Sequence, residues 1–213
     1  MVVDRYDASG TVEGQYEPGS NKKVLKNKLG ITSTEEMDKA EAQALLAAMQ
    51  RLLQDFEADQ QFTAKDICHM HEEWLGSIYE WAGQYRQVQL SKGEFPFAAA
   101  NRVPSLMEQY EKEQLAKFTP CDGMSHETLA KAMAECHVEF ELIHPFREGN
   151  GRVGRIVTTL MALQAGLPPL NYDLLVDERK EDYYAAIQTG LDKNYVPMEE
   201  LFLEIIKHSL TSS

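Results

Sequence analysis

The sequence predicts an all-α fold that carries one short β-hairpin. Apolar residues recur at the spacing of amphipathic helices along most of the chain, whereas one short stretch alternates in the manner of a strand. The chain has 213 residues, enough for one domain with its own apolar core and too few for a second full domain. We therefore expect a polar N-terminal arm over residues 1–23 and a single domain over residues 24–210.

Two helices are predicted in the N-terminal half. Ser33 and Glu36 form a capping box, and apolar residues follow at helical spacing to about Asp59. A second helix is predicted after Thr63, with an apolar stripe that runs to Trp81.

The stretch "YRQVQLSKGEFPF", residues 85–97, changes period. Val88 and Leu90 alternate with glutamines, and Ser91-Lys92-Gly93 offers a turn, so we expect a hairpin here. Further helices are predicted between breaks at proline and glycine, over roughly 101–117, 125–143, 151–165, 177–192 and 197–210.

Charge and cysteine content limit the classes of function. The chain has 21 basic and 34 acidic residues, a net charge of −13, which disfavours general attraction to nucleic acid or to an anionic membrane. No stretch has the length and apolarity expected of a membrane span. The odd set Cys68, Cys121 and Cys136 lacks C-x-x-C spacing, so we expect neither disulfides nor a zinc cluster and place the chain in the cytoplasm.

The segment "HPFREGNGRVGR", His144 to Arg155, holds the densest set of chemically useful residues. Its glycines formally match the G-x-G-x-x-G fingerprint of dinucleotide-binding folds, but that fingerprint has to follow a strand. Here it follows a predicted helix, which disfavours a dinucleotide site. Gly149, Asn150 and Gly151 can instead form a nest of backbone N–H groups at the start of the next helix, where an anion is stabilised.

The charged residues of this segment suit a polyphosphate and a metal ion. Arg152 and Arg155 lie on one helix face, and Arg147 lies on the other side of the nest. Glu148 is expected to hold Mg²⁺ between itself and the phosphates. His144 suits a general base that takes a proton from a hydroxyl group.

Three other histidines give weaker indications of a functional role. His69 and His71 lie too far apart around a helix to share a metal, so we expect ordinary helix residues. His137 could share a face with His144, and packing or support of the site is the favoured role.

The twelve-residue segment resembles the signature loop of the Fic family, H-x-F-x-(D/E)-G-N-G-R-x-x-R, and matches every specified position. Similarity to bacterial Fic proteins extends over roughly residues 24–205, through "VLKNKLGI", "IYEWAGQYR", "SKGEF" and "YYAAI". The resemblance implies a Fic-type helical bundle with a flap hairpin. It also implies transfer of AMP from ATP to a Ser, Thr or Tyr hydroxyl of a target protein, with release of pyrophosphate.

The resemblance also implies roles for the loop. His144 would deprotonate the target hydroxyl, Glu148 would hold Mg²⁺ and Asn150 would contact the α-phosphate. Arg152 and Arg155 would bind the distal phosphates, and Gly149 and Gly151 would supply N–H donors. Phe146 would pack beneath the loop.

Further roles lie outside the loop. The flap, with Lys92 and Gly93 at its turn, would pair with an extended stretch of the target. Tyr183 and Tyr184 would flank the adenine, with a place in the core as the alternative.

The sequence leaves two ways in which the implied transfer activity could be inhibited. A formal match to the inhibitory motif (S/T)-x-x-x-E-(G/N) occurs at Ser9–Gly14, with Glu13 as its glutamate, but glycines and β-branched residues make this a poor helix. A separate antitoxin-like partner is therefore favoured, which would make the chain a possible toxin of a toxin–antitoxin pair. Rival functions are Fic-type transfer of UMP or phosphate, and nucleotide binding without turnover. Homo-oligomer formation also stays open.

Overall fold

The computed structural model describes residues 11–93, 95–177 and 179–211, which form two compact units. Unit 1 comprises the described residues up to Asp55, together with Lys65–Pro104 and Pro145–Gly149. Unit 2 comprises Phe56–Ala64, Ser105–His144 and the described residues from Asn150 onwards. Neither unit is continuous in sequence, so the single domain over 24–210 stays a prediction.

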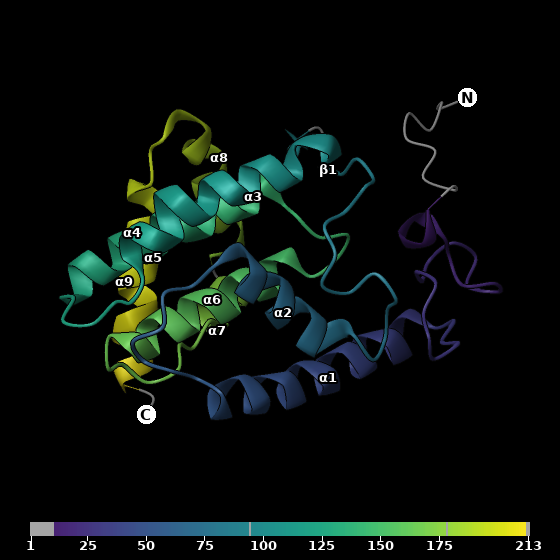
Figure 1. Ribbon diagram of the computed structural model, residues 1–213, viewed down its shortest axis with the longest axis horizontal. Coiled ribbons are helices and arrows are strands. Elements are labelled where there is room, and N and C mark those ends of the chain that lie inside the picture. Colours follow the sequence, from purple (N-terminus) through teal and green to yellow (C-terminus); the bar gives the residue numbers. More distant parts are fainter. Residues whose placement is uncertain (1–10, 94, 178, 212–213) are drawn as a thin grey trace. The chain divides into compact units, whose positions relative to one another are not determined.

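The all-α prediction is confirmed, because helices make up the regular structure of the described residues apart from one two-stranded hairpin (Figure 1). The first elements along the chain are the 3₁₀ turn η1 (Val12–Gly14), α1 (Thr34–Gln54), α2 (Ala64–Leu75), β1 (Ser91–Lys92), β2 (Phe95–Pro96) and the 3₁₀ turn η2 (Ala100–Arg102). They are followed by α3 (Val103–Tyr110), the π-helical turn η3 (Glu111–Leu115), α4 (Ala116–Phe118), α5 (His126–Ile143) and α6 (Asn150–Gln164). The last are α7 (Asp173–Asp177), α8 (Lys180–Thr189), the 3₁₀ turn η4 (Gly190–Asp192) and α9 (Val196–Thr211).

Helix α1 begins where the sequence predicts, because the Ser33 hydroxyl accepts the N–H of Glu36. Its buried face includes a glutamate, Glu41, whose carboxylate accepts the hydroxyl of Tyr79 at 2.8 Å. The backbone carbonyl of Glu41 accepts the indole N–H of Trp74 at 2.9 Å. These two bonds tie α1 to α2 and to the segment after it.

The prediction that the second helix extends to Trp81 is wrong, because α2 ends at Leu75. The N–H groups of Ile78 and Tyr79 both donate to the Leu75 carbonyl and form a turn. Ile78 and Trp81 are buried as predicted, but in a folded-back segment. Burial in a turn and burial on a helix stripe give similar spacing in sequence, which explains the error.

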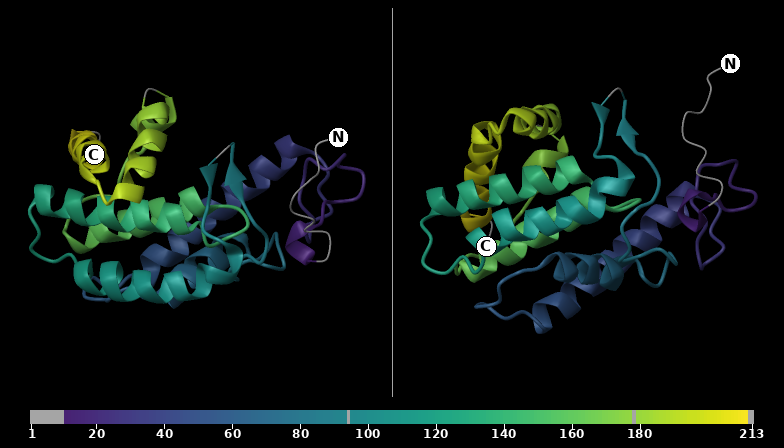
Figure 2. Two further views of the ribbon diagram at one scale, coloured as in Figure 1. Left: turned by 90° about the horizontal axis from the view of Figure 1, so that it is seen from above. Right: turned by 45° about the horizontal axis from the view of Figure 1, so that its top comes forward.

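The hairpin is shorter than residues 85–97. Among the described residues, Ser91 and Lys92 pair with Pro96 and Phe95 in an antiparallel register (Figure 2). The N–H of Phe97 also donates to the Leu90 carbonyl at 3.1 Å. Below them, Arg86 is buried and its guanidinium donates to the carbonyls of Val88, at 2.8 Å, and Ala98, at 2.6 Å. Beyond Leu90 and Phe97, the base of the flap is thus joined through the Arg86 side chain instead of a continuous ladder.

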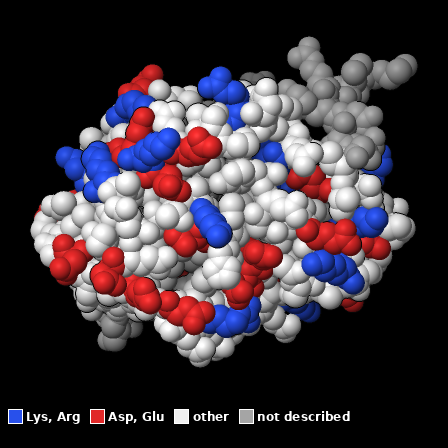
Figure 3. Space-filling model, in the orientation of Figure 1, with Lys and Arg blue, Asp and Glu red and all other residues white. Residues whose placement is uncertain are grey.

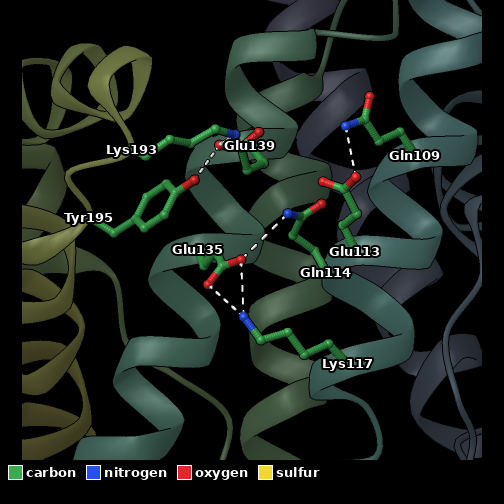
Figure 4. A network of polar contacts seen from close by, with 8 residues as sticks. All are labelled: Gln109, Glu113, Gln114, Lys117, Glu135, Glu139, Lys193 and Tyr195. Carbon is green, nitrogen blue, oxygen red and sulfur yellow. Dashed lines mark hydrogen bonds and ion pairs between the residues drawn. The ribbon is translucent and has the colours of Figure 1, made fainter.

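Unit 2 is built around α5, which packs against α6, α8 and α9 (Figure 1). Most of α5 is buried, and its apolar residues occur on every side of the helix, as expected for a central helix. Its more exposed glutamates make polar contacts: Glu135 binds Lys117 at 3.2 Å, and Glu139 binds Lys193 at 2.8 Å and the Tyr195 hydroxyl at 2.5 Å (Figure 4). These contacts fix α5 relative to its neighbours.

Acidic and basic side chains are interspersed on the face drawn in Figure 3, with acidic groups gathered along its lower edge. None of the helices formed by the described residues combines the length and apolarity needed to cross a bilayer.

Candidate active site

The loop from His144 to Arg155 is divided between the units, with residues 145–149 in unit 1 and the rest in unit 2. In unit 1, Phe146 is fully buried and stacks on His71, with ring centroids 3.9 Å apart and planes 7° apart. The carbonyl of Pro145 accepts the N–H of Arg86 at 2.8 Å. The loop is therefore held to α2 and to the base of the flap.

His71 fixes this half of the loop through both ring nitrogens. Its Nδ1 accepts the N–H of Gly83 at 2.8 Å, and its Nε2 lies 3.1 Å from the carbonyl oxygen of Glu148. Because the first partner can only donate and the second can only accept, the ring is neutral with its proton on Nε2. Burial lowers the pKa of His71 to about 4, so the ring keeps this state at neutral pH.

Gly149 is required for two reasons. Its φ of +86° lies in the left-handed region, and a Cβ atom there would lie 2.5 Å from Cζ3 of Trp74. The backbone therefore packs directly on the indole ring. Sequence reasoning assigned Gly149 to anion binding and did not detect this contact.

The two charged residues of the loop in unit 1 have different surroundings. Glu148 is exposed, and its Oε1 accepts the N–H of Gly149 at 3.0 Å. Arg147 is half-buried and its Nε donates to the backbone carbonyl of Glu13 at 3.1 Å. This contact to the N-terminal segment was not predicted.

Glu13 has a structural partner within unit 1. Its carboxylate is buried and Oε1 accepts the N–H groups of Gln87, at 2.6 Å, and Val88, at 3.0 Å. These two donors are thereby withdrawn from the hairpin ladder. Ser9, the first residue of the formal inhibitory motif, lies outside the described residues. Glu13 itself lies in a single 3₁₀ turn, Val12–Gly14, which Thr11 caps.

In unit 2, His144 directly follows α5. Its backbone is left-handed, with φ 51° and ψ 61°, and its N–H still donates to the Phe140 carbonyl. The ring Nδ1 lies 3.3 Å from the carbonyl oxygen of Glu141 and 3.6 Å from its Oε2. Both oxygens favour a proton on Nδ1, which places the lone pair of the neutral ring on Nε2.

Helix α6 begins at Asn150, and its first turn carries the predicted phosphate-binding residues. Asn150 is buried, whereas Gly151, Arg152 and Arg155 are partly exposed. The N–H groups at the start of a helix point outward along its axis, and the helix dipole adds positive charge there. Within unit 2, His144 follows α5, and Arg152 and Arg155 lie on α6, which packs against α5.

The predicted residues outside the loop lie in different settings. Lys92 and Gly93 are exposed at the hairpin turn. Tyr183 is buried and its hydroxyl lies 2.7 Å from Nε2 of His137, while Tyr184 is half-buried beside it. Burial and, to a lesser degree, the positive charge of Arg155 lower the pKa of His137 to about 3. Tyr183 thus has a core contact, the alternative to the adenine role.

Comparison with known proteins identifies relatives. A model described as the Fic/DOC family matches residues 61–162. A Sinorhizobium fredii protein, named as a probable protein adenylyltransferase, is 31% identical over 153 residues, which cover 70% of this chain and 74% of that protein. A protein adenylyltransferase of Bartonella henselae is 26% identical over 210 residues, covering 87% of this chain and 36% of that longer protein.

Solved structures agree on the fold. The N-terminal Fic domain of a VirB-translocated effector protein from Bartonella quintana, solved with bound ADP, is similar with a TM-score of 0.70 and 25% identity. The match covers 87% of this chain and 91% of that one.

Proposed function

This chain belongs to the Fic/DOC family, and we propose that it is a protein adenylyltransferase that moves AMP from ATP to a hydroxyl side chain of a target protein. The observation that carries the proposal is the complete loop, in which His144 follows α5 with oxygen atoms at its Nδ1 and α6 opens with Asn150. Relatives named as protein adenylyltransferases support the same reaction.

His144 is the base of this reaction. Its Nε2 takes the proton of the target hydroxyl as the oxygen attacks the α-phosphorus of ATP. The bond from the α-phosphorus to the bridging oxygen breaks, and pyrophosphate leaves with the electron pair. The products are the AMP ester of the target, pyrophosphate and one proton.

The first turn of α6 binds the phosphates. Its backbone N–H groups and the side chain of Asn150 contact the α-phosphate, where negative charge has to be stabilised during attack. Arg152 and Arg155 bind the distal phosphates, which become the leaving group. Both are partly exposed, as ligand-binding side chains need to be.

Glu148 fits a Mg²⁺ ion that accompanies ATP. Its carboxylate is exposed, and the N–H of Gly149 orients one oxygen. Across the described ranges, no cluster of three or more His, Cys, Asp or Glu residues could hold a metal ion. One carboxylate with phosphate oxygens and water is a usual set of Mg²⁺ ligands, and bound Mg²⁺ would neutralise phosphate charge.

The flap hairpin docks the target. Both residues of β1 are exposed, and an exposed strand edge can pair with an extended segment of another chain. Lys92 and Gly93, exposed at the turn, would contact such a segment, and Tyr183 and Tyr184 would flank the adenine.

A separate inhibitory partner accounts for regulation better than Glu13 does, because the carboxylate of Glu13 is already bound to the backbone of Gln87 and Val88. We extend the proposal to a cytoplasmic toxin with an antitoxin-like partner. Co-purification with the product of a neighbouring small gene, and loss of labelling when it is added, would test this point.

The test of the activity uses ATP labelled at either end. The chain and a His144→Ala variant are incubated with Mg²⁺ and a bacterial lysate, with radiolabel on the α- or the γ-phosphate. Label that enters protein from α-labelled ATP only, and only with intact His144, supports adenylyl transfer. Label from γ-labelled ATP alone would mean phosphate transfer. Unchanged labelling by His144→Ala would remove His144 as the base.

A further inference from the structure

Glu141 is a buried carboxylate to which the proposed reaction assigns no role. It lies on α5 one turn before His144 and is 5% exposed. A carboxylate is costly to bury unless it interacts with polar or charged groups. One such group is the ring of His144, the residue that follows α5, with Nδ1 at 3.6 Å from Oε2.

The carboxylate lies against the first turn of α6. A Cβ atom at Gly154 would lie 3.2 Å from Oε1 of Glu141, and one at Gly151 would lie 3.8 Å from it. His137, one turn earlier on α5, lies against the same Gly154, 2.8 Å from that added atom. Gly154 is not a specified position of the family pattern, yet only glycine leaves room here for both side chains.

The side chains in the interior around Glu141 include a neutral histidine and a positively charged arginine. His137 is neutral at physiological pH and binds the hydroxyl of Tyr183 at 2.7 Å. Arg155, on α6, supplies positive charge to the same interior, where it acts on His137, Tyr172 and Tyr183. Glu141 therefore shares the space against Gly154 with a neutral histidine and lies 3.6 Å from the His144 ring, all within unit 2.

We propose that Glu141 is a positioning residue for His144. The two oxygens of Glu141 near Nδ1, one from the backbone and one from the side chain, hold the proton on Nδ1 and keep Nε2 as the proton acceptor. After proton transfer, the carboxylate stabilises the positive imidazolium. The inference rests on the proposed function, in which His144 is the base, and adds the group that orients it.

The orienting role has a structural reason. His144 has a left-handed backbone and lies just beyond the helix, so the regular helix geometry does not set the direction of its ring. The carbonyl contact is present whatever the side chain at 141, but only the carboxylate adds negative charge. A neutral replacement of equal size should therefore weaken the preference for one tautomer without moving the backbone.

The test compares Glu141→Gln with Glu139→Gln. Glu139 lies on the same helix, where it binds Lys193 and Tyr195 (Figure 4), so its variant is a matched loss of one carboxylate. Three quantities are measured: the tautomer of His144 from imidazole ¹⁵N chemical shifts, the Kd for ATP by calorimetry, and kcat for transfer of α-label. The tautomer and the Kd can both be measured without transfer activity.

Glu141→Gln is expected to shift His144 towards a mixture of tautomers and to lower kcat about 10- to 100-fold, the usual effect of losing such an orienting partner. Its Kd for ATP should stay within about twofold, because no phosphate contact is lost. Glu139→Gln should keep the native tautomer and kcat. If Glu141→Gln folds poorly, Glu141→Asp keeps the charge one methylene further back and should favour Nδ1–H less strongly than the native chain does.

Native values of both tautomer and kcat in Glu141→Gln would overturn the inference and leave the proposed function standing. An equal tautomer shift in Glu139→Gln would also overturn it, because the effect would then belong to the helix in general. If the native chain transfers no label, the proposed function fails, and the ¹⁵N measurement still decides whether Glu141 orients His144.

Discussion

Replacing Gly149 by alanine is expected to destabilise the protein by about 2–5 kcal/mol. The left-handed backbone, with φ +86°, costs an L-residue about 1–2 kcal/mol. The added Cβ atom would lie 2.5 Å from Cζ3 and 2.9 Å from Cη2 of Trp74, where carbon atoms normally approach to about 3.5 Å. Either the loop or the indole has to move by about 1 Å. Overpacking of this kind costs about 1–3 kcal/mol.

The matched control is Gly30→Ala. Gly30 also has a left-handed backbone, with φ +67°, but nothing lies within 4 Å of an added Cβ atom. The free energy of unfolding of Gly30→Ala should therefore fall only by the backbone cost, about 1–2 kcal/mol. The difference between the two variants measures the Trp74 contact. Both free energies are measured by urea unfolding, monitored by circular dichroism. The midpoints are compared with a common slope of free energy against urea concentration.

A third variant tests the cause directly. In a Trp74→Phe background the outer indole ring is absent, so Gly149→Ala should lose its packing cost and keep its backbone cost. Equal losses for Gly149→Ala and Gly30→Ala, or an undiminished Gly149→Ala loss in the Trp74→Phe background, would refute the proposed clash.

Three further predictions follow from the site. Arg155→Ala should weaken binding of ATP more than of ADP, because Arg155 is assigned to the distal phosphates; equal losses in calorimetry would contradict that assignment. Glu13→Ala should lower the free energy of unfolding by about 1–3 kcal/mol, because the buried N–H of Val88 and the part-buried N–H of Gln87 lose a charged acceptor. It should also lower label transfer, and a gain in transfer would restore Glu13 as an inhibitor. For His71 the folded-state pKa, about 4, lies below the ordinary 6.5, so the unfolded state binds the proton first as pH falls. Stability is therefore full above about pH 6.5 and should decrease by up to about 3 kcal/mol by pH 4; a His71→Gln variant should show a shallower decrease in urea midpoint, and an identical slope would exclude His71 as the source.

The candidate loop could be predicted because its residues are neighbours in sequence. A histidine, an acidic residue, three arginines and a Gly-Asn-Gly turn before a helix specify an anion site at any position in a fold. Glu141 could also have been found, since it lies three residues before His144 on a predicted helix and such residues are spatial neighbours.

The sequence by itself determined the all-α class, the start of α1 and the composition of the loop, because helical periodicity and capping depend on residues within one or two turns of each other. Tertiary structure decided what supports the loop. His71 reaches Glu148 across 77 positions, and Glu13 reaches Val88 across 75. No local pattern encodes such contacts, since they arise only when segments distant in sequence are packed together. The end of α2 at Leu75 has the same origin: the apolar spacing continues to Trp81, but burial there is achieved by a turn.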